Sequence, residues 1–227
     1  TAMKRAVFVD EVIIEHRHFV NDKARFDELY QFNAKHDDHD RLLFEERRAR
    51  GFDAPKIVLS ILICAIPSRR EQLERLVGYL RWQMREFPQQ VEICVDLDTQ
   101  CTVGTKRQRL LERAVGCYVA FVDDDDGIDS RYVERVLKAC AEGKDCCSLV
   151  GVITENGANP KRFEHSMNNS GWYTREDGVY IRTANHLNAV IRELALQAGF
   201  VAKNIGEVHA YANALVPLLK SEESTGE

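Results

Sequence analysis

The chain has 227 residues, a hydrophobic fraction of 44% and a formal net charge of -5 at pH 7. This length allows one sizeable α/β domain with an appendage, and the composition is that of a globular protein with an ordinary buried core. The acidic balance argues against a surface built mainly to grip nucleic-acid phosphates, although it does not exclude nucleic acid as a partner. No apolar stretch approaches the roughly 20 residues of a membrane helix, so we expect a cytoplasmic protein without a membrane span.

The first 54 residues are predicted to form an N-terminal helical extension. A short apolar run at 6–14 precedes charged segments with helical spacing around residues 26–30 and 42–44. From residue 56 the pattern changes to strand-length apolar runs at 57–66, 91–97 and 117–123, separated by amphipathic stretches. Such alternation is typical of βαβ units and a mainly parallel sheet.

The helices between these strands have recognisable starts. Ser68, with Glu71 three residues later, forms a capping-box pattern for the first helix, and Gly104 opens the second, at 104–116. A third helix is expected at 131–143, and two more at 188–198 and 207–219. The seven cysteines include no C-x-x-C pair, so we expect buried, reduced thiols.

The stretch "AFVDDDDGID", residues 120–129, brings an apolar strand straight into four aspartates. Ligands of open α/β sheets lie outside the carboxyl ends of the strands, which is where these carboxylates are placed. Like charges this close repel one another unless a cation lies among them. Clustered carboxylates suit Mg²⁺ or Mn²⁺ shared with substrate phosphates, so the stretch predicts a divalent metal that carries a diphosphate.

Two other acidic patterns compete with this interpretation. An EF-hand loop with Gly127 at its sixth position would need ligands at Val122 and Val133, and both are apolar, so this alternative fails. "VDLDTQ", residues 95–100, is similar to an Asp-x-Asp phosphatase pattern after a strand. It remains a weak alternative.

Four stretches follow one another along the chain: "ILICAIPSR", "VEICVDLDTQCTVGTKRQRLLERAVGCYVAFVDDDDGID", "NHLNAVIRELALQAGF" and "IGEVHAYANALVPLLK". Taken in this order, they resemble family 2 glycosyltransferases of the GT-A fold, in a branch that occurs in phages and bacteria. The resemblance covers residues 56 to about 222. It implies a GT-A domain at 55–227, with a Rossmann-like, mainly parallel sheet flanked by helices. The nucleotide-binding half would be 55–145 and the acceptor half 146–227.

The resemblance also implies roles for individual residues. The loop after the first strand would lie against the base and ribose, a later acidic residue would bond the base, and the start of the second helix would favour the nucleotide's charge. The nucleotide-binding set implied in this way is Pro67, Ser68, Arg69, Asp96 or Asp98, Gly104, Lys106, Arg107, Asp123 and Asp124.

The metal and acceptor sites are implied in the same way. Asp123 and Asp125 match the family's Asp-x-Asp metal motif, and His186 would be a further metal ligand. The acceptor-binding set is Trp172, Tyr173 and His209.

One departure from the family bears on catalysis. The acceptor-side motif Gly-Glu-Asp reads Gly206, Glu207, Val208 here, and valine cannot accept the acceptor's proton. Position 208 is where the base is expected, and Glu207 is the carboxylate that could replace it.

The sequence thus predicts a metal-dependent, inverting glycosyltransferase that uses Mn²⁺ or Mg²⁺ and a nucleotide-sugar, most simply a UDP-sugar, with an unknown acceptor. A catalytically impaired nucleotide-sugar-binding module and a nucleotidyltransferase are the alternatives. Association into a homo-oligomer is left open.

Overall fold

A computed structural model describes residues 6–9, 12–15, 57–155 and 158–226. The chain divides into two compact units, Thr1–Ala54 and Pro55–Glu227. In the first unit, strands β1 (Ala6–Val9) and β2 (Val12–Glu15) pair in antiparallel fashion. The helical segments predicted around residues 26–30 and 42–44 lie outside the described residues.

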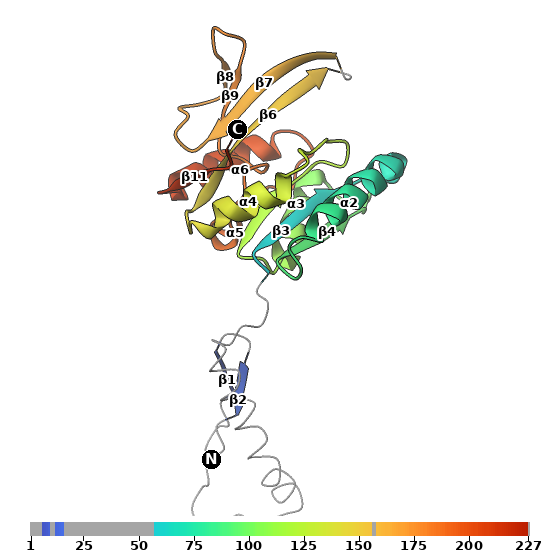
Figure 1. Cartoon of the computed structure of the whole chain (residues 1–227), viewed down its shortest axis with the longest axis vertical. Helices are drawn as coiled ribbons and strands as arrows, with labels where there is room; N and C mark the ends of the chain where they lie inside the picture. Colours follow the sequence, from blue (N-terminus) through green and yellow to red (C-terminus); the bar gives the residue numbers. More distant parts are fainter. Residues whose placement is uncertain (1–5, 10–11, 16–56, 156–157, 227) are drawn as a thin grey trace, which may run out of the picture. The chain divides into compact units, whose positions relative to one another are not determined.

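The second unit is built on one sheet with the strand order β4-β3-β5-β10-β6-β7-β9-β8, and β11 pairs with β6 (Figure 1). Strands β3 (Leu59–Cys64), β4 (Val91–Asp96) and β5 (Tyr118–Phe121) are parallel, as their apolar runs predicted. The short β10 (Val190–Ile191) lies between β5 and β6 and is antiparallel to both. The sheet is therefore parallel in its first half and mixed in its second.

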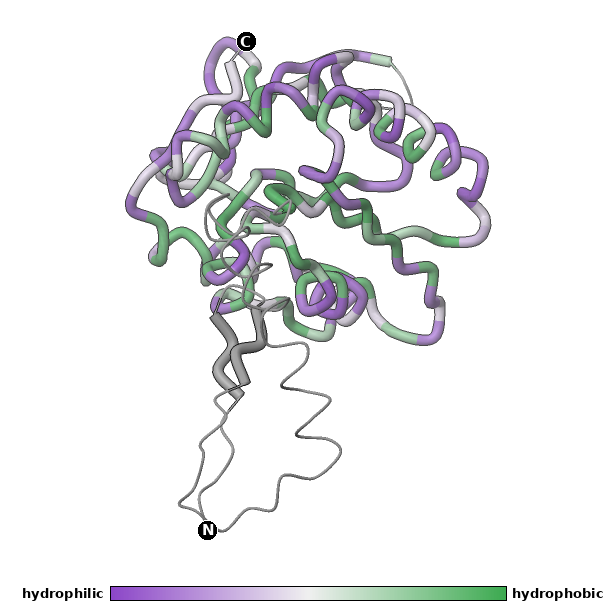
Figure 2. Tube along the Cα trace, turned by 60° about the horizontal axis from the view of Figure 1, so that its bottom comes forward, coloured by the Kyte–Doolittle hydropathy of each residue, from purple (hydrophilic) through white to green (hydrophobic). Residues whose placement is uncertain are grey.

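Helices cover both faces of the parallel half. Helices α2 (Arg70–Met84) and α4 (Tyr132–Ala141) pack on one face, and α3 (Val103–Arg113), α5 (Arg192–Ala198) and α6 (Glu207–Leu215) pack on the other. Alternate residues of β3 face opposite layers, so Ile61 lies in the first core and Leu62 in the second. Figure 2 shows apolar residues concentrated along the central strands, with hydrophilic residues in the outer segments.

The starts of two helices differ from their predictions. A 3₁₀ turn, η1 (Pro67–Arg69), precedes α2, and the N-cap of α2 is Arg69 without a side-chain cap, so the Ser68–Glu71 capping box is not formed. The N-cap of α3 is Thr102, whose hydroxyl accepts a hydrogen bond from the Thr105 amide at 3.2 Å. Helix α6 is followed by a second 3₁₀ turn, η2 (Val216–Leu218).

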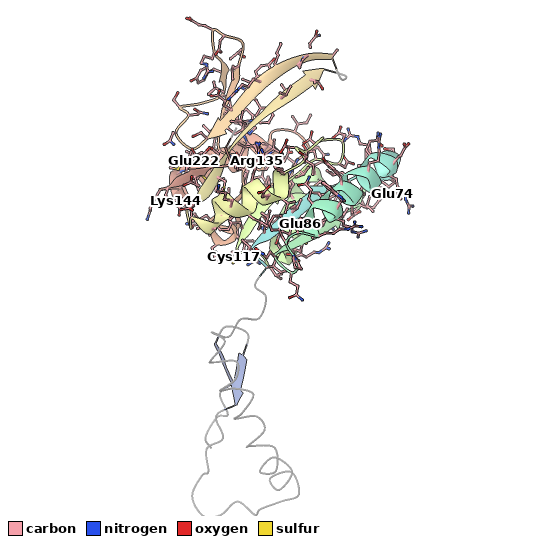
Figure 3. The ribbon with its side chains drawn as sticks, viewed as in Figure 1. Glu74, Glu86, Cys117, Arg135, Lys144 and Glu222 are labelled. Atoms are coloured by element: carbon pink, nitrogen blue, oxygen red, sulfur yellow. The ribbon has the colours of Figure 1, made fainter. Side chains whose placement is uncertain are left out.

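The second half of the sheet continues as an arm beyond the helical layers (Figure 1). It consists of β6 (Cys146–Glu155), β7 (Ala158–Ser166), β8 (Tyr173–Thr174) and β9 (Tyr180–Thr183). Strand β11 (Glu222–Ser224) pairs with the start of β6. Figure 3 labels Glu222 of this strand. Its carboxylate accepts hydrogen bonds from the Ser166 hydroxyl at 2.6 Å and the Met167 amide at 2.7 Å. The end of the chain thus anchors the base of the arm.

Two further predictions concern the cysteines and the membrane. All seven cysteines are free thiols, as predicted, and four of them are buried: Cys94, Cys140, Cys146 and Cys147. Within the part of the chain that the structure describes, no helix is long and apolar enough to cross a membrane.

Two glycines allow a matched test of the packing. A Cβ at Gly104 would overlap the backbone carbonyl of Val201, whereas a Cβ at Gly78, in the exposed middle of α2, would meet nothing within 4 Å. We expect Gly104→Ala to lower the free energy of unfolding by about 1 to 3 kcal/mol. Gly78→Ala should raise it by about 0.5 to 1 kcal/mol because alanine favours the helix. Urea denaturation measures both, and equal effects of the two substitutions would contradict this packing.

Candidate functional site

Three parallel strands place polar side chains at one edge of the sheet. Strand β3 leads into the η1 loop, β4 ends in Asp96, and β5 is followed by the four aspartates 123–126. Because the carboxyl ends of parallel strands meet at the same edge, these segments lie together. Direct contacts confirm this, since the Ile66 amide donates to the Asp124 carboxylate at 3.2 Å.

A buried arginine connects the first aspartate to helix α6. Nη2 of Arg107 donates to Oδ1 of Asp123 at 3.0 Å, and its Nε lies 3.8 Å from Oε1 of Glu207. The guanidinium also lies over the rings of Phe121, at 5.1 Å, and Phe200, at 5.9 Å. The structure therefore brings together three residues of the predicted site from well-separated parts of the sequence.

Several buried nitrogens at this point have no hydrogen-bond partner within the described residues. They are Nε and Nη1 of Arg107 and both ring nitrogens of His186. Nε2 of His186 lies 3.8 Å from Oδ2 of Asp123, which is too long for a hydrogen bond. Buried polar groups are nearly always paired, so this cluster of unpaired donors and acceptors fits a site that a ligand completes.

The next two aspartates have a different partner. Nη1 of Arg69 lies 2.9 Å from Oδ1 of Asp124 and 3.1 Å from Oδ2 of Asp125. Asp124 is buried and also accepts from the Ile66 amide, so its carboxylate ties the β5 loop to the β3 loop. Asp124 is thus engaged within the protein by Arg69 and the Ile66 amide, and its predicted contact with a nucleotide stays a prediction. Pro67 and Ser68, in the same η1 turn, are exposed.

The acidic end of β4 is held by an arginine that the sequence analysis did not single out. Nη2 of Arg109 lies 2.8 Å from Oδ2 of Asp96, and its Nη1 lies 2.9 Å from Oδ2 of Asp98. A hydrogen bond from the Gln100 amide and another from Arg109 lower the pKa of Asp98. Asp96 is buried and Asp98 half-buried, so Asp98 is the more accessible of the two.

The start of α3 is not open to a ligand. The Gly104 amide donates to the carbonyl of Lys203 at 3.0 Å, and the Val103 amide donates to the Asn204 side chain at 3.0 Å. Nζ of Lys106 is buried and donates to the Ala65 carbonyl at 2.7 Å. The polar groups of Gly104 and Lys106 bind neighbouring loops, whereas Arg107, in the same helix turn, pairs with Asp123. The predicted contacts of Gly104 and Lys106 with a nucleotide stay predictions.

The three predicted metal ligands are not all gathered into one cluster. Among the described residues there is no group of three or more His, Cys, Asp or Glu side chains placed to hold a metal ion. Asp123 and His186 form a pair, while Asp125 lies with Asp124 on Arg69. A carboxylate suits Mn²⁺ or Mg²⁺ when substrate phosphates supply further oxygen ligands, and a neutral imidazole nitrogen is compatible with Mn²⁺. The Asp123–His186 pair thus fits a metal that arrives with its substrate.

The charges of this pair are shifted by their surroundings. Burial opposes ionisation of Asp123, but the charge of Arg107 and its 3.0 Å hydrogen bond outweigh it and hold the pKa of this carboxyl well below its usual range. Burial and the Arg107 charge lower the pKa of His186 to about 4, so the ring is neutral at pH 7. A neutral imidazole can donate its lone pair to a metal.

Helix α6 begins at the position of the departure from the family motif. Gly206 has a φ of 80°, and Glu207, the first residue of α6, is buried beside Arg107. Val208 is half-buried and has no proton-accepting group. Glu207 is therefore the carboxylate of α6 that reaches the site.

The three residues predicted to bind the acceptor do not form one surface. Trp172 and His209 are in edge-to-face contact, with ring centroids 5.1 Å apart. Tyr173 pairs with Ile181, so its side chain lies on the opposite face of the arm from Tyr180 and Arg182. The structure thus keeps Trp172 and His209 together and separates Tyr173 from them.

A cavity of about 580 Å³ lies elsewhere, between the end of α2 and the start of α4. Trp82, Phe87, Arg131 and Glu134 are among the residues that line it. None of the predicted site residues lines it, so it is separate from the edge of the sheet described above.

Comparisons with known proteins bear on the fold. No family model and no curated protein matches the chain. Among solved structures, S. aureus TarS 1-349 has a TM-score of 0.51 at 15% identity over 74% of this chain and 57% of that chain. Its complex with UDP-GlcNAc has a TM-score of 0.52 at 15% identity, over 74% of this chain and 55% of that chain. A further TarS structure has a TM-score of 0.52 at 14% identity, over 74% of this chain and 35% of that chain.

This likeness has a limited meaning. The chain spans between about one third and three fifths of the TarS chains. At this identity the likeness shows the fold alone, and it confirms the predicted α/β, Rossmann-like fold of the GT-A type.

The crowding of the aspartates gives a pH-dependent prediction. Partial desolvation in the loop and the neighbouring Asp123 charge raise the pKa of Asp126 from 3.8 to about 6. A raised carboxyl pKa means that the charged form destabilises the folded state, and this cost grows as the pH rises from about 4 through 6. We expect Asp126→Asn to raise the melting temperature at pH 7.5 and to have no such effect at pH 4.

Asp125→Asn is the matched control for this experiment. It removes a carboxylate one position away that pairs with Arg69, so it should not raise the melting temperature at pH 7.5. Thermal scans at the two pH values measure both variants. A gain for Asp126→Asn that is the same at pH 4 and pH 7.5 would contradict the raised pKa.

Proposed function

We propose that this chain is a metal-dependent glycosyltransferase that moves a sugar, with inversion of its anomeric centre, from a UDP-sugar to an acceptor hydroxyl. The observation that carries the proposal is the row His186–Asp123–Arg107–Glu207 at the carboxyl edge of a GT-A sheet, in which the half-buried Asp123 lies between the buried His186 and Arg107. This row combines unpaired nitrogens, a carboxylate that is charged at neutral pH and a second carboxylate one step away.

The donor is inferred from charge and from the related fold. A nucleoside diphosphate brings negative oxygens, which match the two unpaired nitrogens of Arg107. Structures of S. aureus TarS, which has the same fold, are in complex with UDP-GlcNAc and with UDP. This supports a UDP-sugar over other nucleotide-sugars. Asp98, half-buried at the end of β4, is the candidate to bond the base.

Asp123 and His186 would hold Mn²⁺ or Mg²⁺. When bound, such a cation supplies positive charge that stabilises the departing diphosphate. Arg107 fixes the Asp123 carboxylate by its 3.0 Å hydrogen bond and keeps it charged. Arg69 holds the rest of the aspartate loop in place through Asp124 and Asp125.

Glu207 is the candidate general base. The acceptor hydroxyl oxygen forms a bond to the anomeric carbon, its proton passes to the Glu207 carboxylate, and the bond from the anomeric carbon to the phosphate oxygen breaks with release of UDP. Nε of Arg107 lies 3.8 Å from Oε1 of Glu207, so the proposed base and the Asp123 carboxylate both lie beside the same guanidinium. Attack on the face opposite to the leaving group accounts for the proposed inversion.

Donor binding tests the Asp123 site. Asp123→Asn removes the charge that Arg107 and His186 face, so we expect the affinity for UDP-GlcNAc in the presence of Mn²⁺ to fall by more than about tenfold. Isothermal titration calorimetry measures this affinity. Glu193→Gln, which neutralises an exposed carboxylate in the first turn of α5, is the control and should bind as the unmodified chain does. Unchanged binding by Asp123→Asn would refute the proposed donor site.

Turnover tests the role of α6. Glu207→Gln should still bind UDP-GlcNAc but release UDP about 10²- to 10⁴-fold more slowly, because a positioned base contributes about that much. The measurement is UDP release from UDP-GlcNAc with Mn²⁺, alongside a melting curve to show that the variant folds.

A substitution at position 208, next to Glu207, distinguishes an active enzyme from an impaired one. If the unmodified chain binds the donor without turnover and Val208→Asp gains it, the chain is an impaired transferase. Turnover by Glu207→Gln at the original rate would remove Glu207 from the mechanism.

A further inference from the structure

The arm presents a row of aromatic and basic side chains on one of its faces. Strand partners share a face, so Phe163 on β7 lies with Tyr180 on β9, and His165 lies with Arg182. Trp172 joins them by contact with Arg182. We call Tyr180, Arg182, Trp172 and His209 the aromatic ladder.

The members of the ladder follow one another at regular steps. The Arg182 guanidinium lies 5.2 Å from the Tyr180 ring centroid and 5.3 Å from that of Trp172. The Trp172 ring lies 5.1 Å from the His209 ring. At the other end, Nζ of Lys161 lies 5.3 Å from the Tyr180 ring. The ladder therefore runs from the outer part of the arm to the first turn of α6, two residues beyond Glu207.

The ladder is held rigidly in place. Nη1 of Arg182 donates to the carbonyls of Ile181, at 2.8 Å, and Tyr173, at 3.1 Å. Nε1 of Trp172 donates to the Thr183 hydroxyl at 2.9 Å. Rings that are fixed before binding lose little conformational entropy when a ligand arrives.

The ladder is nevertheless partly open to solvent. Trp172 is 39% exposed, although tryptophan is among the residues that gain most from burial. Gly151 on β6 carries no side chain, and the Phe163 ring occupies the space that a Cβ would need there. The Phe163 ring therefore packs directly on the backbone of β6 beside the ladder.

An uncharged sugar chain matches this chemistry. A pyranose ring offers C–H faces to the electron-rich faces of aromatic rings, and its hydroxyls can accept hydrogen bonds from a guanidinium or bond to an imidazole. A row of rings in fixed positions suits a ligand with repeated flat units. The Tyr180, Trp172 and His209 rings of the ladder form such a row.

The arm as a whole carries no net charge, and beside the ladder rings lie two cationic side chains, Lys161 and Arg182, which are few for a polyanion. Residues 146–183 contain four basic and four acidic residues, so their formal charges cancel: Lys161, Arg162, Arg175 and Arg182 against Glu155, Glu164, Glu176 and Asp177. Arg175 pairs with Glu164 at 3.2 Å and with Asp177 at 2.9 Å. Binding of nucleic acid or another phosphodiester chain depends mainly on many available cations.

We infer that the aromatic ladder binds an uncharged oligosaccharide and that this oligosaccharide is the acceptor. The last member of the ladder, His209, lies on α6, the helix that also carries Glu207, so the ladder leads from the arm to the helix of the proposed base. The inference rests on the proposed glycosyl transfer for the acceptor role, while the binding itself is independent of the donor site.

The chain contains two tryptophans, which makes a direct binding assay available. Trp82→Phe leaves Trp172 as the sole tryptophan, and Trp82 lies on α2, away from the arm. The probes are maltohexaose, cellohexaose and chitohexaose, with a twelve-residue oligothymidylate as the anionic comparison. We expect at least one hexaose to change the Trp172 fluorescence in a saturable manner without any nucleotide, and oligothymidylate to leave it unchanged.

Variants locate the binding. In the Trp82→Phe background, Tyr180→Ala should weaken hexaose binding by about 2- to 10-fold. By calorimetry, Trp172→Ala should weaken it to a similar or greater degree. Tyr173→Ala, which removes an exposed aromatic ring of β8 from the opposite face of the arm, should leave the affinity unchanged. Melting curves identify any variant that fails to fold.

The outcomes separate this inference from the proposed function. Asp123→Asn should bind the hexaose normally while losing UDP-GlcNAc, so a chain that binds hexaose but never transfers sugar refutes the transferase and leaves the ladder as a glycan site. The inference itself is overturned if none of the three hexaoses binds, if oligothymidylate binds in their place, or if Trp172→Ala and Tyr180→Ala bind as tightly as the Tyr173→Ala control.

Discussion

A positive charge that is taken out of water, as the Arg107 guanidinium is, must be matched by negative charge and by polarisable groups around it. The negative charge comes from two carboxylates, Asp123 after the end of β5 and Glu207 at the start of α6. The Phe121 and Phe200 rings cover the guanidinium. The contacts of Arg107 therefore link the parallel half of the sheet to helix α6. They also leave two Arg107 nitrogens unpaired within the described residues, beside the unpaired His186.

The parts of this arrangement that follow from local sequence were predictable. Strands β3, β4 and β5 are short apolar runs that end in polar residues, and their period and length identify them without any tertiary information. The placement of Asp96 and Asp123 at the carboxyl edge follows from the parallel order alone. The fold was therefore predictable, and so was the region of the sheet in which the aspartates lie.

The direction of each side chain was not predictable, because contacts distant in sequence decide it. Asp124 turns to the β3 loop since Ile66 and Arg69 are there to pair with it. The amides at the start of α3 are used by residues about 100 positions later, Lys203 and Asn204. The sequence did offer a signal for Arg109, because this arginine lies about two turns into the helix that follows a strand ending in Asp96. For Arg182 there was none, because its contacts depend on how β7, β8 and β9 pair.

The position of β10 has a consequence for how this protein is made. Its two residues, Val190 and Ile191, bridge β5 and β6 by pairing with Tyr118, Val119 and Cys146, which come more than 40 residues earlier in the chain. On the ribosome, the α/β units up to β5 can fold as they emerge, but the sheet cannot close until residue 190 has left the tunnel. Until then the facing edges of β5 and β6 have unsatisfied backbone groups, and nascent chains of this length would be open to pairing with the wrong strand.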